Sequence, residues 1–245
     1  MAGSLIYEGR SLLGGGYIFV AAIRSSRNAK TGNMVQTYIM CQHPDPLTAS
    51  KLGIDFDICG NCRHRGSATT APARKIAKDR TCYVNLAQGA LQVYKAYRRG
   101  AYEYEAPESV GRGKYVRVGT YGDPAAVPAS VWRALLSNSA GHTAYSHQFE
   151  TAGADFDASI FMRSVDSRAE AYAAAAAGQR SFRVINQADY SAGRDAPIAG
   201  LEVSCPASAE AGRRTTCVDC LLCSGAQLRA KSVAIVAHGA AGGKV

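Results

Sequence analysis

The chain has 245 residues, a mass of 25.8 kDa and a formal net charge of +9, with a pI near 9.2. This length can bury a core without help from a metal, and it fits one large domain or one domain with small metal-bound lobes. A hydrophobic content of 47% excludes a disordered chain. No run approaches the roughly 18 apolar residues of a membrane span, and the N-terminus lacks the basic-then-apolar order of a signal peptide. We therefore expect a cytoplasmic protein without a membrane partner.

The charge and the cysteines narrow the partner and the chemistry. An excess of basic residues favours a polyanionic partner, nucleic acid or a nucleotide first, although a generally basic protein with no such partner is equally compatible. In a reducing cytosol, eight clustered cysteines indicate metal ligands or redox groups rather than disulfides. The sequence carries no signal for an oligomeric state.

In chain order, the first forty residues predict turns and buried strands, including a strand over residues 34–40 that ends at a cysteine. A first cysteine group follows, spaced C-x17-C-x2-C-x19-C and formed by Cys41, Cys59, Cys62 and Cys82. The central CxxC with Gly60 inside it is typical of a metal knuckle, and His43 and His64 are spare ligands. Three cysteines with an open position fit this pattern as well as a closed four-cysteine site does.

Residues 83–100 predict a helix that ends at a basic pair before Gly100. A soft boundary near residue 110 separates an N-terminal part, 1–110, from a β/α part, 111–245, within what we expect to be one compact domain. Past this boundary, short apolar strands are predicted over residues 115–119, 142–147, 159–165, 181–186, 200–205 and 232–238. A helix from Pro128 ends at Gly141, and a second helix over 168–177 is capped by Asp166 or Ser167.

Alternation of short apolar strands with helices predicts a parallel sheet. We expect an α/β fold in the form of an incomplete or distorted (β/α) barrel with cysteine-rich metal-binding loops. An open doubly wound sheet is the alternative.

Polar residues follow several predicted strands, at the place where parallel α/β folds carry their sites. We expect four of them to line the substrate side as catalytic residues: Asp123, His147, Asp166 and His238. Cofactor-binding residues are expected at the same edge: Tyr121, Gly122 and Asn186. The alternative for Asp166 is that it only caps the following helix.

The sharpest metal signal is the second cysteine group, spaced C-x11-C-x2-C-x2-C. It consists of Cys205, Cys217, Cys220 and Cys223. Three cysteines within seven residues favour an iron–sulfur (4Fe-4S) cluster, with the fourth ligand returning from a loop. Zinc held by four thiolates is the alternative, and a reduced, metal-free loop is a third interpretation.

Several of these patches resemble a known group of proteins. They are Asn33-Met34, the knuckle at 59–62, Cys82-Tyr83 with the helix after it, the stretch 119–123 and the closing cysteine run. Together they are similar to uncharacterised cysteine-rich proteins of tailed phages and mobile elements, the gene product 88-like family being the nearest. The resemblance implies a phage-derived metal-binding protein and supplies no catalytic assignment.

These observations predict a phage-type iron–sulfur α/β-barrel protein that acts on nucleic acid or nucleotides. The alternative is a non-catalytic nucleic-acid-binding or host-interaction protein whose loops are stabilised by zinc. In that case the basic segment 63–78 and the pair Arg98-Arg99 contact phosphates, and binding weakens steeply with salt.

Overall fold

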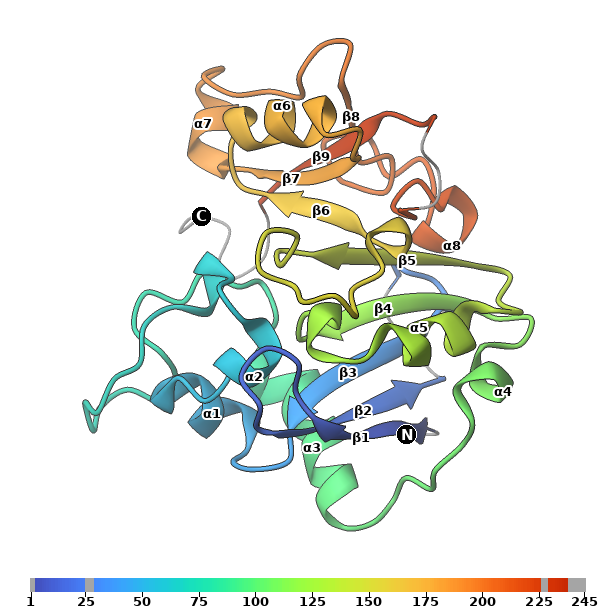
Figure 1. Cartoon of the computed structure of the whole chain (residues 1–245). Helices are drawn as coiled ribbons and strands as arrows, with labels where there is room; N and C mark the ends of the chain where they lie inside the picture. The colour runs from blue at the N-terminus through green and yellow to red at the C-terminus, as the bar shows by residue number, and fades with distance from the viewer. Residues whose placement is uncertain (1–2, 25–28, 226–228, 238–245) are drawn as a thin grey trace.

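The computed structural model describes residues 3–24, 29–225 and 229–237 (Figure 1). Within these ranges the fold is a mixed α/β fold around one nine-stranded sheet, in the order β1-β2-β3-β4-β5-β6-β7-β9-β8. The strands are β1 (Gly3–Arg10), β2 (Tyr17–Ile23), β3 (Val35–Cys41), β4 (Tyr115–Tyr121), β5 (Gly141–Ser146), β6 (Met162–Val165), β7 (Ser181–Ile185), β8 (Glu202–Ser204) and β9 (Ser232–Val236).

The sheet is antiparallel at its N-terminal end and parallel elsewhere. β1, β2 and β3 pair antiparallel, whereas every further pair from β3 to β8 is parallel. The predicted alternation and the mainly parallel pairing are therefore confirmed. β3 pairs with β4, so the sheet continues across the predicted boundary near residue 110.

The expected barrel is wrong, because the sheet is open. Closure requires the two outermost strands to pair, and here β1 and β8 lie at opposite ends of the strand order. The antiparallel β1–β2–β3 meander extends the sheet at one edge, and nothing in the described ranges joins that edge to β8. A sheet of this kind still places the carboxyl ends of its parallel strands along one edge.

The helices are short. They are α1 (Pro46–Leu52), α2 (Phe56–Cys59), α3 (Leu91–Arg98), α4 (Pro107–Gly111), α5 (Ala129–Leu136), α6 (Arg168–Ala176), α7 (Gln187–Ser191) and α8 (Cys217–Cys220). Four short turns complete the list: η1 (Arg63–Arg65), the π-type η2 (Leu86–Ala90), η3 (Pro124–Ala126) and η4 (Ala158–Ile160). In the described ranges, no helix has both the length and the apolar character needed to cross a membrane.

Two predicted helices differ from the structure in detail. The helix expected over 83–100 is interrupted, because Gln88, inside η2, has non-helical dihedral angles. α6 agrees with its prediction, but its cap is Ser167, whose Oγ accepts a hydrogen bond of 3.1 Å from the Glu170 backbone N–H. Asp166 therefore does not cap α6 and remains available for other contacts. Gly141 opens β5 instead of ending the helix before it.

The core of the described ranges consists of two larger apolar clusters and a small one formed by Val165, Ala171 and Ile198. The larger apolar cluster joins β1 to β5 with α3 and α5, where Trp132 is fully buried and its Nε1 donates to the Pro124 carbonyl at 2.9 Å. Tyr97 of α3 stacks on Phe19 of β2 with 3.7 Å between ring centroids. A smaller cluster over β6, β8 and β9 includes Cys205 and Cys223. Two of the four cysteines of the second group are thus buried in the core of the C-terminal half.

Candidate metal centres

Three neighbouring strand ends converge at the carboxyl edge of the sheet. Asp123, His147 and Asp166 follow β4, β5 and β6, as the sequence predicts. His147 Nε2 lies 3.7 Å from Asp166 Oδ1, and the Asp123 carboxylate accepts a hydrogen bond of 2.8 Å from the His147 backbone N–H. The order of parallel strands in the sheet thus brings together side chains that are far apart in the sequence.

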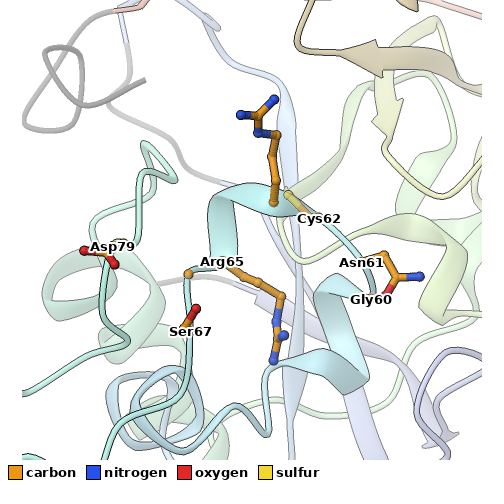
Figure 2. A pocket seen from close by; sticks show the side chains of 8 residues that line it. Gly60, Asn61, Cys62, Arg65, Ser67 and Asp79 are labelled. Atoms are coloured by element: carbon orange, nitrogen blue, oxygen red, sulfur yellow. The ribbon is translucent and has the colours of Figure 1, made fainter.

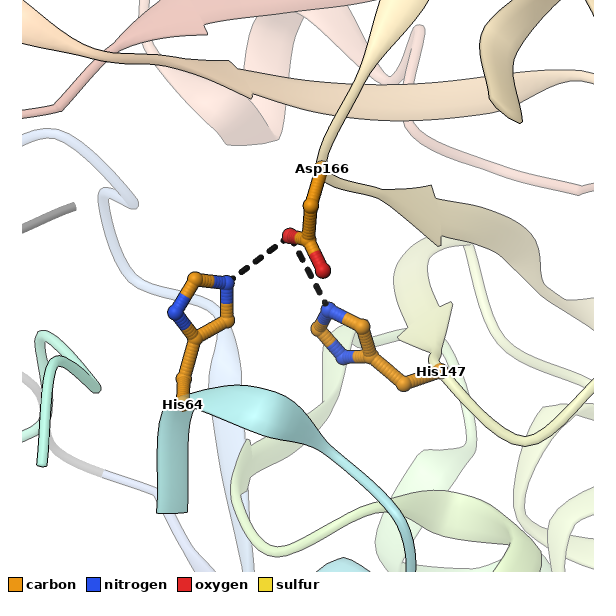
Figure 3. Close-up of side chains that lie close together, drawn as sticks. All are labelled: His64, His147 and Asp166. Atoms are coloured by element: carbon orange, nitrogen blue, oxygen red, sulfur yellow. Dashed lines mark hydrogen bonds and ion pairs between the residues drawn. The ribbon is translucent and has the colours of Figure 1, made fainter. Parts of the chain in front are cut away.

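A second histidine joins this edge from outside the sheet. His64, in η1, places its Nε2 2.8 Å from Asp166 Oδ1 and its Nδ1 2.7 Å from Thr81 Oγ1. The ligand atoms of His64, His147 and Asp166 all lie within 4.8 Å of one another (Figure 3). We name these three residues the strand-edge site. In the described part of the chain, no other group of three His, Cys, Asp or Glu side chains is this close. The sequence marks His64 only as a spare ligand.

Burial and charge act in opposite directions on the strand-edge site. Burial lowers the pKa of His147, but the neighbouring Asp166 carboxylate and Cys62 thiol outweigh burial and raise this pKa well above 6.5. Burial raises the pKa of Asp166, but His147 and His64 outweigh it and hold this pKa far below its usual range. A metal ion that binds here has to displace the imidazole proton of His147, because a histidine binds metals through a neutral ring.

Asp123 is committed to the loop that carries His147. Its carboxylate is 8% exposed and accepts hydrogen bonds from Ser146 Oγ at 2.7 Å, from the His147 N–H and from the Ala125 N–H at 3.0 Å. Burial raises the pKa of Asp123, and these hydrogen bonds oppose that rise. Asp123 therefore fixes the position of His147, and the structure gives it no contact with a cavity.

The knuckle of the first cysteine group packs against the strand-edge site. Cys62 lies beside the His147 ring, and Cys59 and Cys82 are electrostatic neighbours of Cys62. Burial raises the pKa values of the Cys59 and Cys82 thiols. A metal site on the first cysteine group stays a prediction, because in the described part of the chain no three of its thiols lie within 4.8 Å of one another.

Cys41, the predicted fourth ligand, is buried at the end of β3. Its thiol donates to the Ile54 carbonyl at 3.7 Å, and burial raises its pKa to about 12, with Asp57 and Asp55 as the nearest acidic neighbours. Its electrostatic neighbours do not include another cysteine.

The predicted cofactor-binding residues make contacts within the protein. Tyr121 is buried, which raises the pKa of its hydroxyl well above 10. Gly122 has a positive φ of 82° and packs against Ile39, so a Cβ would lie 2.7 Å from the Ile39 Cβ. Asn186 caps α7 by accepting from the Ala188 and Asp189 N–H groups. His238 lies outside the described residues.

A polar pocket of about 290 Å³ opens beside the knuckle. It is lined by Gly60, Asn61, Cys62, Arg63, Arg65, Gly66, Ser67 and Asp79, and Figure 2 shows Asn61 and Asp79 on opposite sides of η1. Arg65 is occupied by Asp55, at 2.8 Å. Arg63 is largely exposed, and its Nε lies 4.0 Å from Asp166 Oδ2. Arg63 therefore connects the pocket with the strand-edge site.

The second cysteine group surrounds a cavity of its own. Cys205, Cys217, Cys220 and Cys223 all line one small space of about 20 Å³, with Thr143 and Val233 of the sheet among the other lining residues. Backbone hydrogen bonds hold the segment in place. The Cys205 N–H donates to Ala234 O at 2.8 Å, the Cys217 N–H to Lys30 O at 2.8 Å, and the Ala144 N–H to Cys223 O at 3.0 Å. The two cysteine groups are separate, since neither cavity includes a cysteine of the other group.

Two arginines accompany this second cavity without a carboxylate partner among the described residues. Arg180 is 6% exposed and donates to the carbonyls of Leu222 and Ser224, on either side of Cys223, and to that of Lys231. Arg117 is an electrostatic neighbour of Cys217, and its Nε is buried with no hydrogen-bond partner. Positive charge therefore gathers around four side chains that are neutral as thiols.

Burial also raises the pKa values of the cysteines in this group. The pKa of Cys223 rises to about 12, although the nearby Tyr145 hydroxyl opposes the rise, and those of Cys205 and Cys217 rise as well. Metal coordination converts thiols to thiolates and would reverse this preference.

The comparisons with known proteins supply no further assignment. No protein-family model, no curated protein and no solved structure matches this chain. The roles of all these residues therefore rest on their chemistry and geometry alone.

Proposed function

We propose that this is a metal-binding protein that holds an iron–sulfur cluster on Cys205, Cys217, Cys220 and Cys223. The observation that carries the proposal is that all four cysteines line a single small cavity. Four cysteines around one cavity are suited to bind one thiophilic centre.

The charges around the cavity support the same reading. Four metal-bound thiolates carry more negative charge than the metal core neutralises, so the centre as a whole is an anion. Arg117 and Arg180 are the groups that such an anion needs as neighbours, because a buried cation without a counter-charge costs several kcal/mol. The partnerless Nε of Arg117 is a donor that an anionic centre would satisfy.

Zinc is the second candidate, and separate observations favour each metal. One tetrahedral zinc ion holds its four sulfurs about 3.8 Å apart, given Zn–S bonds of about 2.3 Å. In the described chain, no three of these cysteine sulfurs lie within 4.8 Å of one another, which favours a larger cluster. The cavity of about 20 Å³, however, is close to the size of a single ion.

Three further expectations remain predictions. The formal charge of +9 is what supports a nucleic acid or nucleotide as partner. Membership of the gene product 88-like family rests on the short patches of similarity, and a cytoplasmic location stays an expectation from the sequence.

Anaerobic purification followed by an absorbance spectrum and by iron, sulfide and zinc analysis tests the proposal. We expect a brown protein with broad absorption near ~400 nm and with iron and sulfide in matched amounts. Cys220→Ser should lose this centre, whereas Cys41→Ser, at a buried cysteine outside the group, should keep it. A colourless protein whose zinc disappears in Cys220→Ser would establish the second candidate. A wild-type chain that carries neither metal at this group would overturn both.

A further inference from the structure

We propose that His64, His147 and Asp166 bind one divalent transition-metal ion at the carboxyl edge of the sheet, separately from the four-cysteine centre. The three side chains come from η1, from the end of β5 and from the end of β6 (Figure 3). Their ligand atoms lie within 4.8 Å of one another, a spacing that one ion can bridge with modest side-chain movement.

The directions of the ring nitrogens support this site. His64 Nδ1 lies 2.7 Å from Thr81 Oγ1, so its Nε2 is left to face Asp166 Oδ1 at 2.8 Å. A proton on Nε2 makes this contact a hydrogen bond to the carboxylate. A metal ion would take the place of that proton, and Nδ1–H would then donate to Thr81.

His147 supplies the independent observation. Its Nε2 is buried and has no hydrogen-bond partner among the described residues, although Asp166 Oδ1 lies 3.7 Å away. A buried ring nitrogen without a partner is costly, and such an atom often marks an ion or water that completes the site. One ion at the centre of the group would satisfy both ring nitrogens and the carboxylate together.

The surroundings hold these ligands in place as a metal site requires. The Asp123 carboxylate binds the His147 backbone N–H, and Thr81 binds the second nitrogen of His64. Hydrogen bonds of this kind, made to atoms of a histidine other than its ligand nitrogen, orient the ring and strengthen metal binding. Two imidazoles and one carboxylate suit zinc or iron(II), and three protein ligands leave coordination positions open.

A polar pocket lies close to the strand-edge site. Arg63 lines the pocket of about 290 Å³ and also lies 4.0 Å from Asp166 Oδ2. Because the pocket is polar and carries this exposed guanidinium, a small anion is the class of ligand that fits beside the ion.

Metal content and zinc titration test the proposal on the full chain. After reconstitution with zinc, Asp166→Asn and His64→Gln should each hold one fewer ion per chain than the wild type. The matched variants Asp189→Asn and His43→Gln, which change the same residue types at exposed positions, should keep the wild-type content. Cys220→Ser should lose the other centre only, so failure here is distinguishable from failure of the proposed cluster.

A second measurement does not depend on any variant. Zinc added to the metal-free wild type beyond the amount that fills the four-cysteine group should shift the ring proton signals of His64 and His147 together in the NMR spectrum, while those of His43 stay in place. If the signals of His64 and His147 do not move, or if Asp166→Asn and His64→Gln retain all of the wild-type metal, the strand-edge site does not bind an ion and the proposal is overturned.

Discussion

The Gln148 side chain donates from Nε2 to the Cys59 carbonyl at 3.0 Å and so ties the cysteine knuckle to the end of β5. Its Oε1 accepts from the Asn61 N–H at 3.3 Å, and the residue is fully buried. His147 immediately precedes Gln148, and His64 follows the knuckle. The Gln148 amide therefore fixes the distance between His64 and His147, the two histidines of the strand-edge site.

Gly60→Ala should move His64 away from His147 and lower the free energy of unfolding by more than about 1 kcal/mol. Gly60 has a φ of +52°, and a Cβ there would lie 2.5 Å from Gln148 Oε1. The substitution thus adds a clash to backbone strain. Urea unfolding at pH 7 measures the loss, and zinc binding at the strand-edge site should weaken in parallel.

Gly178→Ala is the matched control for this change. Gly178 also has a positive φ, +69°, but a Cβ there would meet nothing within 4 Å. It should therefore show the cost of backbone strain alone. Combining Gly60→Ala with Gln148→Ala should recover the part of the loss that comes from the clash. Equal losses for Gly60→Ala and Gly178→Ala would show that Gln148 does not constrain the knuckle.

The sequence predicts the strand ends well because they depend on local pattern. Short apolar runs followed by polar residues mark β4, β5 and β6, and this pattern places Asp123, His147 and Asp166 at strand ends. Once the strands are parallel, convergence of these ends at one edge follows from topology. The barrel was a different kind of inference, because closure depends on how the first and last strands meet, and no local pattern encodes that meeting.

The pairing of His64 with Asp166 could not be predicted in the same way. The two residues are 102 positions apart, and His64 lies in a three-residue turn without a periodic pattern. The spacing Cys62-x-His64 next to a metal knuckle was the one usable signal. The position of Arg117 next to the second cysteine group could not be predicted for a related reason. Its place in the alternating pattern of β4 is that of any solvent-facing residue.

The buried ion pair between β7 and β8 should be the most sensitive point of the C-terminal half. Arg183 and Glu202 are 1% and 5% exposed and are joined by two hydrogen bonds of 2.9 and 2.8 Å. Arg183→Met should cost about 3–5 kcal/mol of unfolding free energy, because it leaves a buried carboxylate without its partner.

The exposed pair Arg194–Asp189 provides the comparison. Arg194→Met should change the unfolding free energy by only about 0–1 kcal/mol. The double variant Arg183→Met with Glu202→Met should recover much of the loss, because it removes both charges at once. A small effect of Arg183→Met in chemical unfolding would mean that solvent reaches this pair.

Acid should weaken the fold partly through Asp195. Burial raises its pKa, but hydrogen bonds from Arg183 at 2.6 Å and Arg168 at 3.1 Å outweigh burial and lower it. Because the folded pKa lies below the unfolded value of about 3.9, the stabilisation is complete above that pH and is lost as the pH falls through the lowered pKa.

Unfolding free energies measured from pH 7 downward should show Asp195→Asn less stable than the wild type at pH 7. The two curves should approach each other below about pH 4. A constant difference between the curves at all pH values would contradict this account.

Arg117→Met should loosen the four-cysteine centre without touching any of its ligands. The Arg117 guanidinium lies near Cys217, and Tyr83 is its one hydrogen-bond partner, at 2.7 Å, among the described residues. Its charge stabilises the centre only while the cysteines are thiolates, so its removal should speed the loss of metal to a chelator by about tenfold or more, equivalent to about 1.4 kcal/mol. Arg112→Met, at an exposed position, should leave that rate unchanged.

In the metal-free protein, Arg117→Met should instead raise the free energy of unfolding, because a cation beside neutral thiols is unfavourable. If Arg117→Met destabilises the metal-free protein and leaves metal loss unaltered, then Arg117 serves the packing of Tyr83, and the charge argument for the centre fails.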